Sequence, residues 1–304
     1  MSIPTGLAIA VDGGQSGLRL RVLPDGRGGS GPGYTHGDKG IAATLAAVRR
    51  AAGEAGVLGE PVEVACLGLT GYPNDPSDVR MLAADLAELL NASEIRLCVD
   101  MVTAHAGALP DGYGVVIAAG TGSVCLAVDH GGTSHRVDGH GYLFGDVGSA
   151  FWIGRAGISA LLRARDGRGP DTALAGLDFD PISLYPSPTV VDDVARFTPV
   201  VLRFAAEGDF VAQGIVLDAA TGLADTIAAG INSLPGVDLV PVACVGGVFQ
   251  AGEQLLAPLR DRLPARADLR PAAGTPLDGA ARLATGPLGP YERLVTVYRS
   301  GAGE

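Results

Sequence analysis

The stretch that decides the fold runs from Val115 to Gly154 and reads VVIAAGTGSVCLAVDHGGTSHRVDGHGYLFGDVGSAFWIG. It opens with two apolar, β-branched runs, 115–119 and 124–128, separated only by Gly120-Thr121-Gly122-Ser123. Two such runs around a short glycine turn predict a β-hairpin. Glycines let the backbone approach a ligand closely, and successive N–H groups in such a turn form a concavity that attracts phosphate. The hairpin is therefore a candidate phosphate site.

The same stretch ends in a second glycine-bounded turn. Gly145-Asp146-Val147-Gly148-Ser149 comes directly before an expected helix through residues 151–153. This spacing predicts that the carboxylate of Asp146 lies in a loop at a helix N-terminus. Either turn alone is as well explained by an ordinary hairpin, so the interpretation as a ligand site depends on the joint pattern.

Composition and charge limit the classes of partner. A chain of 304 residues is long enough for two domains with a substantial core. The net charge of -11 argues against nucleic acid and anionic membrane as partners. No apolar run reaches the roughly 20 residues of a membrane helix, and the start, Met1-Ser2-Ile3-Pro4, has no basic region before an apolar segment. We therefore expect a cytoplasmic protein.

Lysine and cysteine usage excludes several kinds of site. Lys39 is the only lysine and fits neither the position required in a P-loop nor that in a protein kinase. Each cysteine lies in an apolar, strand-like run, which is typical of buried thiols in a reducing compartment: Cys66, Cys98, Cys125 and Cys244. A zinc or iron–sulfur site within one chain is not expected. If the protein binds ATP, it must bind the phosphates with a structure other than a P-loop.

The first half of the chain predicts an α/β layer domain. A buried strand at 7–11 leads into Asp12-Gly13-Gly14-Gln15-Ser16, and an alternating strand at 18–23 completes a hairpin. An Asp at a strand end, two glycines and a hydroxyl form a plausible corner for phosphate and Mg²⁺. Gly26-Arg27-Gly28 to Gly31 is interpreted as a loose surface turn. Further elements are expected in the order helix 41–55, strand 62–69, helix 76–90, strand 95–99 ending on Asp100, and helix 101–109, which is the order of a mixed sheet with helices.

The second half begins after Pro110-Asp111-Gly112, the expected domain boundary, so we predict domains 1–110 and 111–304. A strand at 240–245 enters Gly246-Gly247-Val248-Phe249 before a helix, which is typical of close approach to a flat ligand or a phosphate. The other expected helices cover 156–166, 190–196, 200–207, 211–234, 254–262 and 278–284.

With its three glycine turns in this order, the chain resembles the actin/hexokinase/heat-shock-chaperone ATPase superfamily. More narrowly, it is similar to the N-acetylglucosamine kinase family and to the related activator ATPases of reductase systems. The resemblance covers nearly the whole chain and implies two actin-like (ribonuclease H-like) lobes, each a mixed sheet flanked by helices, with a cleft between them. Four segments carry it: Asp12–Ser16 as the first phosphate motif, Gly120–Ser123 as the second, Gly246–Phe249 as the adenosine motif, and Gly139–Gly148 as the sugar loop.

The resemblance implies a role for each motif, with ATP and Mg²⁺ as cofactors and a homodimer as the usual assembly. Asp100 falls at the family's catalytic aspartate and would accept the proton of a sugar hydroxyl. Asp12 would hold Mg²⁺ through water. The nucleotide would contact Asp12, Gly13, Gly14, Gln15, Ser16, Gly120, Thr121, Gly122, Ser123, Gly246 and Gly247. The sugar would contact His36, Asp100, Thr121, Asp138, Gly139, His140, Gly141 and Asp146.

The sugar loop departs from the family's pattern. Asp138-Gly139-His140-Gly141 stands where relatives that accept N-acetylated sugars commonly have Gly-Gly-Trp-Gly, and Val147 replaces the usual Glu. A carboxylate at Asp138 would favour the ammonium group of free glucosamine. We therefore expect transfer of the γ-phosphate of ATP to the 6-hydroxyl of glucosamine, giving glucosamine 6-phosphate, with N-acetylglucosamine kinase as the alternative.

Three other functional classes of protein stay open as more distant alternatives. An activator ATPase would normally share an iron–sulfur cluster across its dimer, and the strand-embedded cysteines disfavour it. A sugar-responsive repressor would need a helix-turn-helix before the first strand, for which Asp12 comes too early. A filament or chaperone ATPase would lack the sugar loop. ATP turnover that depends on sugar separates the kinase from all three.

Overall fold

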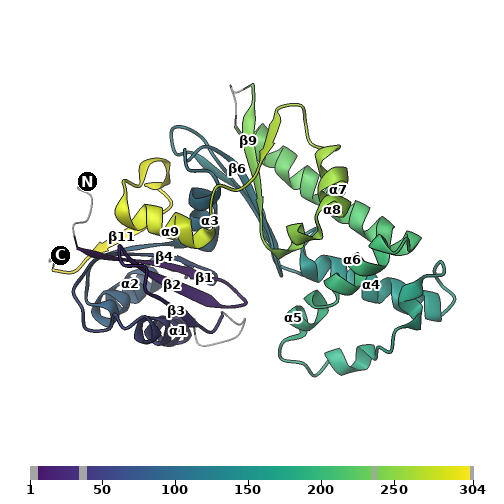
Figure 1. The fold of residues 1–304 in the computed structure, drawn as a ribbon, viewed down its shortest axis with the longest axis horizontal. Helices are drawn as coiled ribbons and strands as arrows, with labels where there is room; N and C mark the ends of the chain where they lie inside the picture. The colour runs from purple at the N-terminus through teal and green to yellow at the C-terminus, as the bar shows by residue number, and fades with distance from the viewer. Residues whose placement is uncertain (1–5, 34–39, 235, 237, 302–304) are drawn as a thin grey trace. The chain divides into compact units, whose positions relative to one another are not determined.

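The computed structural model describes residues 6–33, 40–234, 236 and 238–301. The chain forms two compact units (Figure 1). Unit 1 comprises Met1–Tyr113, Val128–Ser134 and Pro271–Glu304, and unit 2 comprises Gly114–Ala127 and His135–Arg270. The division differs from the expected domains 1–110 and 111–304 mainly in the last segment. This C-terminal segment belongs to unit 1 because its helix and its strand pack against elements of that unit.

Unit 1 is built on a six-stranded mixed sheet in the order β11-β5-β4-β1-β2-β3. Strands β1 (Leu7–Gly13), β4 (Val62–Leu69) and β5 (Ala92–Val99) are parallel neighbours. β2 (Leu18–Leu23) pairs antiparallel with β1 and forms the expected hairpin. The carboxyl ends of the three parallel strands therefore meet at one edge of the sheet.

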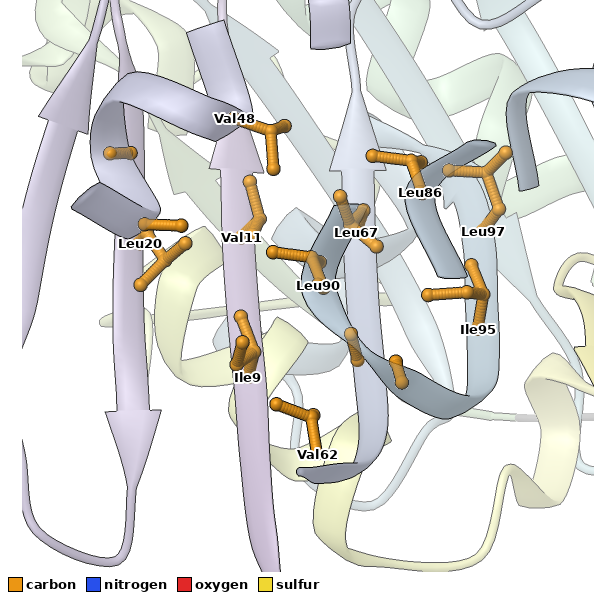
Figure 2. Close-up of a cluster of buried hydrophobic side chains, with 14 of the residues drawn as sticks. Ile9, Val11, Leu20, Val48, Val62, Leu67, Leu86, Leu90, Ile95 and Leu97 are labelled. Atoms are coloured by element: carbon orange, nitrogen blue, oxygen red, sulfur yellow. The ribbon is translucent and has the colours of Figure 1, made fainter. Parts of the chain in front are cut away.

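The core of unit 1 lies between this sheet and helices α1 (Gly40–Glu54) and α2 (Pro76–Leu90). Figure 2 shows Ile9 and Val11 of β1 and Leu67 of β4 beside Val48 of α1 and Leu90 of α2. These strands bury residues on both faces, as their nearly continuous apolar runs predict. Helix α2 starts as expected, because the side chain of Asp75 accepts a hydrogen bond from the N–H of Ser77.

The prediction of a loose surface turn near Gly26–Gly31 is wrong. Residues Gly28–Gly31 form an edge strand, β3, which pairs with β2. A Cβ at Gly29 would lie 1.9 Å from the carbonyl oxygen of Ala51 in α1, and one at Gly31 would lie 2.5 Å from that of Ala47. The glycines are thus required by the close approach of helix and strand, a reason that a turn-based interpretation overlooks.

The other helices of unit 1 are α3 (Asp100–Ala108) and α9 (Pro276–Thr285), which pack against each other. Backbone-to-backbone contact is possible because a Cβ at Gly279 would lie only 1.9 Å from the carbonyl oxygen of Thr103. Strand β11 (Thr296–Arg299) then adds to the free edge of β5. These contacts return the C-terminal segment to unit 1.

Unit 2 contains a five-stranded sheet in the order β10-β9-β6-β7-β8. Its strands are β6 (Gly114–Ala119), β7 (Ser123–Val128), β8 (Ser134–Asp138), β9 (Val240–Val245) and β10 (Ala267–Arg270). β9 runs parallel to both β6 and β10. β6 and β7 are the two runs of the predicted hairpin. The two mixed sheets flanked by helices confirm the expected α/β class.

The helices of unit 2 are α4 (Ala150–Arg165), α5 (Val190–Ala195), α6 (Thr198–Ala206), α7 (Phe210–Asn232) and α8 (Glu253–Arg260). Short 3₁₀ turns lie at Ala173–Gly176, Pro181–Leu184 and Gly247–Ala251, with another at Gly289–Tyr291 in unit 1. Among the described helices, α7 is the one long and apolar enough to cross a membrane. Its burial against the sheet, with Gly230 next to Cys125 and Val115, fits a core helix instead.

Candidate active site

Three polar residues follow the three parallel strands of unit 1. Asp12 lies at the end of β1, Thr70 comes directly after β4, and Asp100 begins α3 directly after β5. Because β4 lies between β1 and β5 in the sheet, Thr70 lies between the two carboxylates. The strand order thus brings together Asp12 and Asp100, which are far apart in the sequence.

Asp12 is half-buried and close enough to Asp100 to affect its charge. Burial, helped by the negative charge of Asp100, raises the pKa of Asp12 to about 6, and Arg19 partly offsets this. Arg19 stands directly across from Asp12 in the β1–β2 ladder. The corner therefore carries negative charge that the protein compensates only in part.

Thr70 connects Asp100 to the first glycine turn. Its hydroxyl donates a short hydrogen bond to Oδ2 of Asp100. Its N–H donates to the carbonyl oxygen of Gly13 at 2.7 Å. The sequence prediction did not include Thr70, although a polar residue directly after a buried strand is the same signal that singled out Asp100.

The first glycine turn is tightly held. The N–H of Gly14 donates to the carbonyl of Gly17 at 3.0 Å. A Cβ at Gly33 would lie 1.9 Å from the carbonyl oxygen of Gln15, so the segment after β3 lies directly against this turn. Ser16, at the tip, is exposed. The predicted sugar residue His36 lies outside the described residues.

A small cavity of about 30 Å³ opens beside this turn. A cavity of this volume has room for about one or two groups the size of a water molecule. The wall is made mostly of glycine and apolar residues and includes the hydroxyls of two threonines: Gly13, Gly14, Leu18, Pro32, Gly33, Ala43, Thr44, Ala47, Leu69 and Thr70. Thr70 both lines the cavity and contacts Asp100.

The second glycine turn, in unit 2, is joined to helix α4. The N–H groups of Ala150 and Phe151 donate to the carbonyls of Gly120 and Thr121 at 2.8 and 3.2 Å. The side chain of Ser149 accepts from the N–H of Trp152. The first N–H groups of this helix are therefore used within the protein.

Ser123 and Thr121 differ in their environment. Ser123 is 3% exposed, and its buried hydroxyl has no hydrogen-bond partner among the described residues. Thr121 and Gly122 are partly exposed. Of the two hydroxyls in this turn that were predicted to contact phosphate, only that of Thr121 belongs to a residue accessible to solvent.

Asp146 joins the hairpin to the sugar loop. Its carboxylate accepts hydrogen bonds from the N–H groups of Ser123 and Gly141, and a Cβ at Gly122 would lie 2.7 Å from its Oδ2. Its backbone is left-handed, with φ of 58°. Burial, together with Asp138, raises the pKa of this carboxyl. The predicted sugar ligand thus has a structural role at the base of the loop.

Asp138 is also occupied within the loop. Its Oδ1 accepts from the N–H of Asp146 at 2.9 Å and its Oδ2 accepts from the N–H of Val147 at 3.1 Å. The prediction that this carboxylate serves an ammonium group had assumed a side chain directed at ligand. The structure instead uses both oxygens to fold the loop, which removes the main reason for preferring glucosamine.

The rest of the sugar loop is more open. His140 is exposed, and Gly139 and Gly141 have positive φ angles of 72° and 83°. Val147, in place of the family's Glu, packs against α7, where a Cβ at Gly222 would lie 2.2 Å from its Cγ1. The carbonyls of Gly139 and Gly141 accept hydrogen bonds within the loop, from Arg136 and from the N–H groups of Phe144 and Gly145. The exposed His140 is thus the part of the loop most open to a ligand.

The adenosine motif lies at the same sheet edge of unit 2 as the hairpin. β6 and β9 are parallel neighbours, and Gly246 follows β9. A Cβ at Gly246 would lie 2.3 Å from the carbonyl oxygen of Ala119, whereas one at Gly247 would meet nothing within 4 Å. The structure thus brings Gly246 and Gly247 next to Gly120, and leaves space over Gly247.

The residues at Asp12 fit a magnesium ion. Its raised pKa, caused by burial and by Asp100, marks negative charge that a divalent cation would relieve. Within the described residues there is no cluster of three or more His, Cys, Asp or Glu that could hold a metal. The remaining ligands would be water and phosphate oxygens, which is how Mg²⁺ is usually bound beside a nucleotide.

The cysteines lie inside the two sheets. Cys66, Cys98 and Cys125 are buried. Burial raises the pKa of Cys125 and of Cys244 to about 12. Thiols in this state are poor metal ligands, because the ligand form is the thiolate.

Residues 11–266 match the model of the BadF/BadG/BcrA/BcrD ATPase family. Among curated proteins, the chain is 32% identical over 193 residues to an N-acetylmuramic acid/N-acetylglucosamine kinase of Clostridium acetobutylicum, covering 59% of this chain and 62% of that protein. It is 30% identical over 198 residues to an N-acetyl-D-glucosamine kinase of Dictyostelium discoideum, covering 60% of this chain and 61% of that protein. Both matches thus span about three fifths of the relatives' length.

Among solved structures, the fold is similar to that of a candidate N-acetylglucosamine kinase from Chromobacterium violaceum, with a TM-score of 0.69 and 29% identity. This match covers 91% of this chain and 98% of the other. The likeness extends over both units and confirms the predicted superfamily fold.

Proposed function

The chain belongs to the BadF/BadG/BcrA/BcrD ATPase family, and from that premise we propose that it is an ATP-dependent kinase of N-acetylated amino sugars. The acceptor is the 6-hydroxyl of N-acetylglucosamine or of a close derivative. This replaces glucosamine as the favoured substrate. The names of the curated relatives support the change, and so does the engagement of Asp138 within its own loop.

The observation that carries the proposal is the pair of carboxylates at the ends of β1 and β5. Phosphoryl transfer depends on positioning and charge stabilisation more than on covalent chemistry from the protein. Asp100 accepts the proton of the sugar hydroxyl as that hydroxyl attacks phosphorus. Asp12 holds Mg²⁺, which supplies positive charge to the phosphate oxygens when it is bound.

Unit 2 supplies contacts to the nucleotide. Thr121 and the N–H of Gly122 bind phosphate oxygens at the tip of the hairpin. Gly246 and Gly247 let the nucleoside approach the backbone at the same sheet edge. In the sugar loop, the exposed His140 is the residue that contacts sugar hydroxyls.

The cavity in unit 1 supports the preference for an acetylated sugar. A small space with a mostly apolar wall suits the acetyl methyl group, and Thr70, which contacts Asp100, forms part of that wall. One methyl group more or less in such a pocket typically changes specificity by about 10–200-fold. Free glucosamine would leave the cavity unfilled.

The test is an ADP-release assay with ATP and Mg²⁺ against N-acetylglucosamine, N-acetylmuramic acid, glucosamine and glucose, with a sample without sugar. We expect turnover only with sugar and the highest kcat/KM for an acetylated one. Equal or better kcat/KM for glucosamine would contradict the substrate class. ATP turnover that is independent of sugar would favour an activator-type ATPase.

A matched pair of variants tests the cavity. Ala43→Leu places extra carbons in the cavity wall, whereas Ala42→Leu places them on an exposed position of the same helix. We expect Ala43→Leu to lower kcat/KM for N-acetylglucosamine by about 10-fold and to leave that for glucosamine nearly unchanged. Ala42→Leu should affect neither sugar. An equal loss for both sugars in Ala43→Leu would mean that the cavity does not receive the acetyl group.

A further inference from the structure

Thr70 has two hydrogen bonds that lead to the two sides of the candidate active site. It is the first residue after the central strand β4, and its N–H donates to the carbonyl of Gly13 at 2.7 Å. Its hydroxyl donates to Oδ2 of Asp100. The residue therefore ties the carboxylate at the end of β5 to the glycine turn at the end of β1.

We propose that Thr70 is a positioning residue that holds the carboxylate of Asp100 in the orientation needed for proton transfer; this rests on the proposed kinase activity. A carboxylate at the start of a helix can rotate about its side-chain bonds, and a hydrogen bond to one oxygen fixes that rotation. Displacement of a reacting group by about 1 Å can cost roughly 100-fold in rate. The backbone bond from Thr70 to Gly13 holds the backbone from which this hydroxyl projects.

The local charge adds to this role. The negative charge of Asp100 acts on Asp12, so the two carboxylates repel each other. The hydrogen bond from Thr70 holds Oδ2 of Asp100 in place against that repulsion. A hydroxyl donor stabilises the charged form where it is needed.

The simpler explanation is that Thr70 only fills space, since it also lines the apolar cavity. Two substitutions separate these roles. Thr70→Val keeps the shape of the side chain and removes the donor, whereas Thr70→Ser keeps the donor and removes the methyl group. A positioning role requires the hydroxyl, and a packing role requires the methyl.

The experiment measures kcat and the KM values for ATP and N-acetylglucosamine in the full-length chain. We expect Thr70→Val to lower kcat by about 10–100-fold, with the KM for ATP within about twofold of the wild-type value, and Thr70→Ser to keep at least half of the wild-type kcat. Melting temperature with and without ATP shows that both variants fold and bind nucleotide. A Thr70→Val enzyme with near wild-type kcat, or a Thr70→Ser enzyme as impaired as Thr70→Val, would overturn the proposal.

A double-mutant cycle with Asp100→Asn gives a second readout, because it tests whether the effect of Thr70→Val requires the carboxylate of Asp100. If Thr70 acts through Asp100, then Thr70→Val should change the residual rate of Asp100→Asn by less than about threefold. If instead the rate losses of the two single variants multiply in the double variant, the proposal is overturned. Absence of sugar-dependent transfer in the wild-type protein would overturn the proposed function and this inference with it. Transfer in the wild type with an unaffected Thr70→Val would overturn this inference alone.

Discussion

The two glycine turns, 12–16 in unit 1 and 120–123 in unit 2, have similar sequences and different surroundings. At the first turn, Asp12 and Asp100 are partly exposed, and Thr70 links the turn to Asp100. At the second turn, the carbonyls of Gly120 and Thr121 accept from α4, and the N–H of Ser123 donates to Asp146. The difference indicates that the first turn is arranged for proton transfer and metal binding, whereas most of the second is arranged for rigidity.

The largest effect is expected at the first turn. Asp100→Asn should lower kcat by about 10²–10⁴-fold, because the amide keeps the shape of the side chain but cannot accept the proton. ATP should still raise the melting temperature. ADP release and a thermal shift measure the two properties. If the variant retains more than a tenth of the wild-type kcat, Asp100 is not the base and the first turn has no special chemical role.

Substitutions at the second turn should lower the stability of the protein. Asp146→Ala leaves the N–H groups of the buried Ser123 and the partly exposed Gly141 without their acceptor. The expected cost is about 1–3 kcal/mol in the free energy of unfolding. Asp146→Asn keeps an acceptor and tolerates the left-handed backbone, so it should lose less than half as much. Urea unfolding of the three proteins measures this. Equal stability of Asp146→Ala and wild type would show that the carboxylate does not hold the loop.

A smaller effect should separate the two hydroxyls of the second turn. Thr121→Ala should raise the KM for ATP by about 3–10-fold, the usual size for loss of one ordinary hydrogen bond. Ser123→Ala should change it by less than twofold, because that side chain is buried. Steady-state kinetics on both single variants decide the matter. The reverse order would place the phosphate contact at Ser123 and would require the hairpin to open.

The smallest effect concerns the pH dependence of stability without Mg²⁺. The pKa of Asp12 is raised to about 6 in the folded protein, so the folded state holds this proton more tightly than the unfolded state does. The contribution of Asp12 to stability is therefore most favourable below the unfolded pKa of about 3.9 and is lost as the pH rises to about 6. Asp12→Asn should raise the melting temperature at pH 7 by a few degrees and flatten its decline between pH 4 and 6. A lower melting temperature at pH 7 would contradict the unfavourable burial of this charge.

The sequence predicted the strands and helices that are apolar and periodic. The strands at 62–69 and 240–245 and the helix at 76–90 have the predicted bounds. Short edge strands such as β10 and β11 escaped prediction, because their few residues are held by a neighbouring strand rather than by a local pattern. The same holds for the return of the C-terminal segment to unit 1.

Within the candidate site, strand-end aspartates could be found from sequence because parallel strands end at one edge. The position of a side chain within a glycine-rich loop could not. The sequence around Asp138 suggested that its carboxylate binds a ligand. Its left-handed backbone and its hydrogen bonds from the N–H groups of residues 146 and 147 show instead that it folds the loop. Thr70 was missed because its importance depends on a contact with a residue 30 positions away.

Gly31 of β3 has a consequence for the evolution of specificity. Ala47 lines the cavity, and its carbonyl oxygen lies 2.5 Å from where a Cβ on Gly31 would be. The residue at position 31, which does not line the cavity, therefore limits how closely α1 approaches β3. A side chain there would push α1 outward and make room for a larger group on the sugar. A lineage of such enzymes could thus broaden its substrate range by a change in an edge strand, with every residue that touches the substrate unaltered.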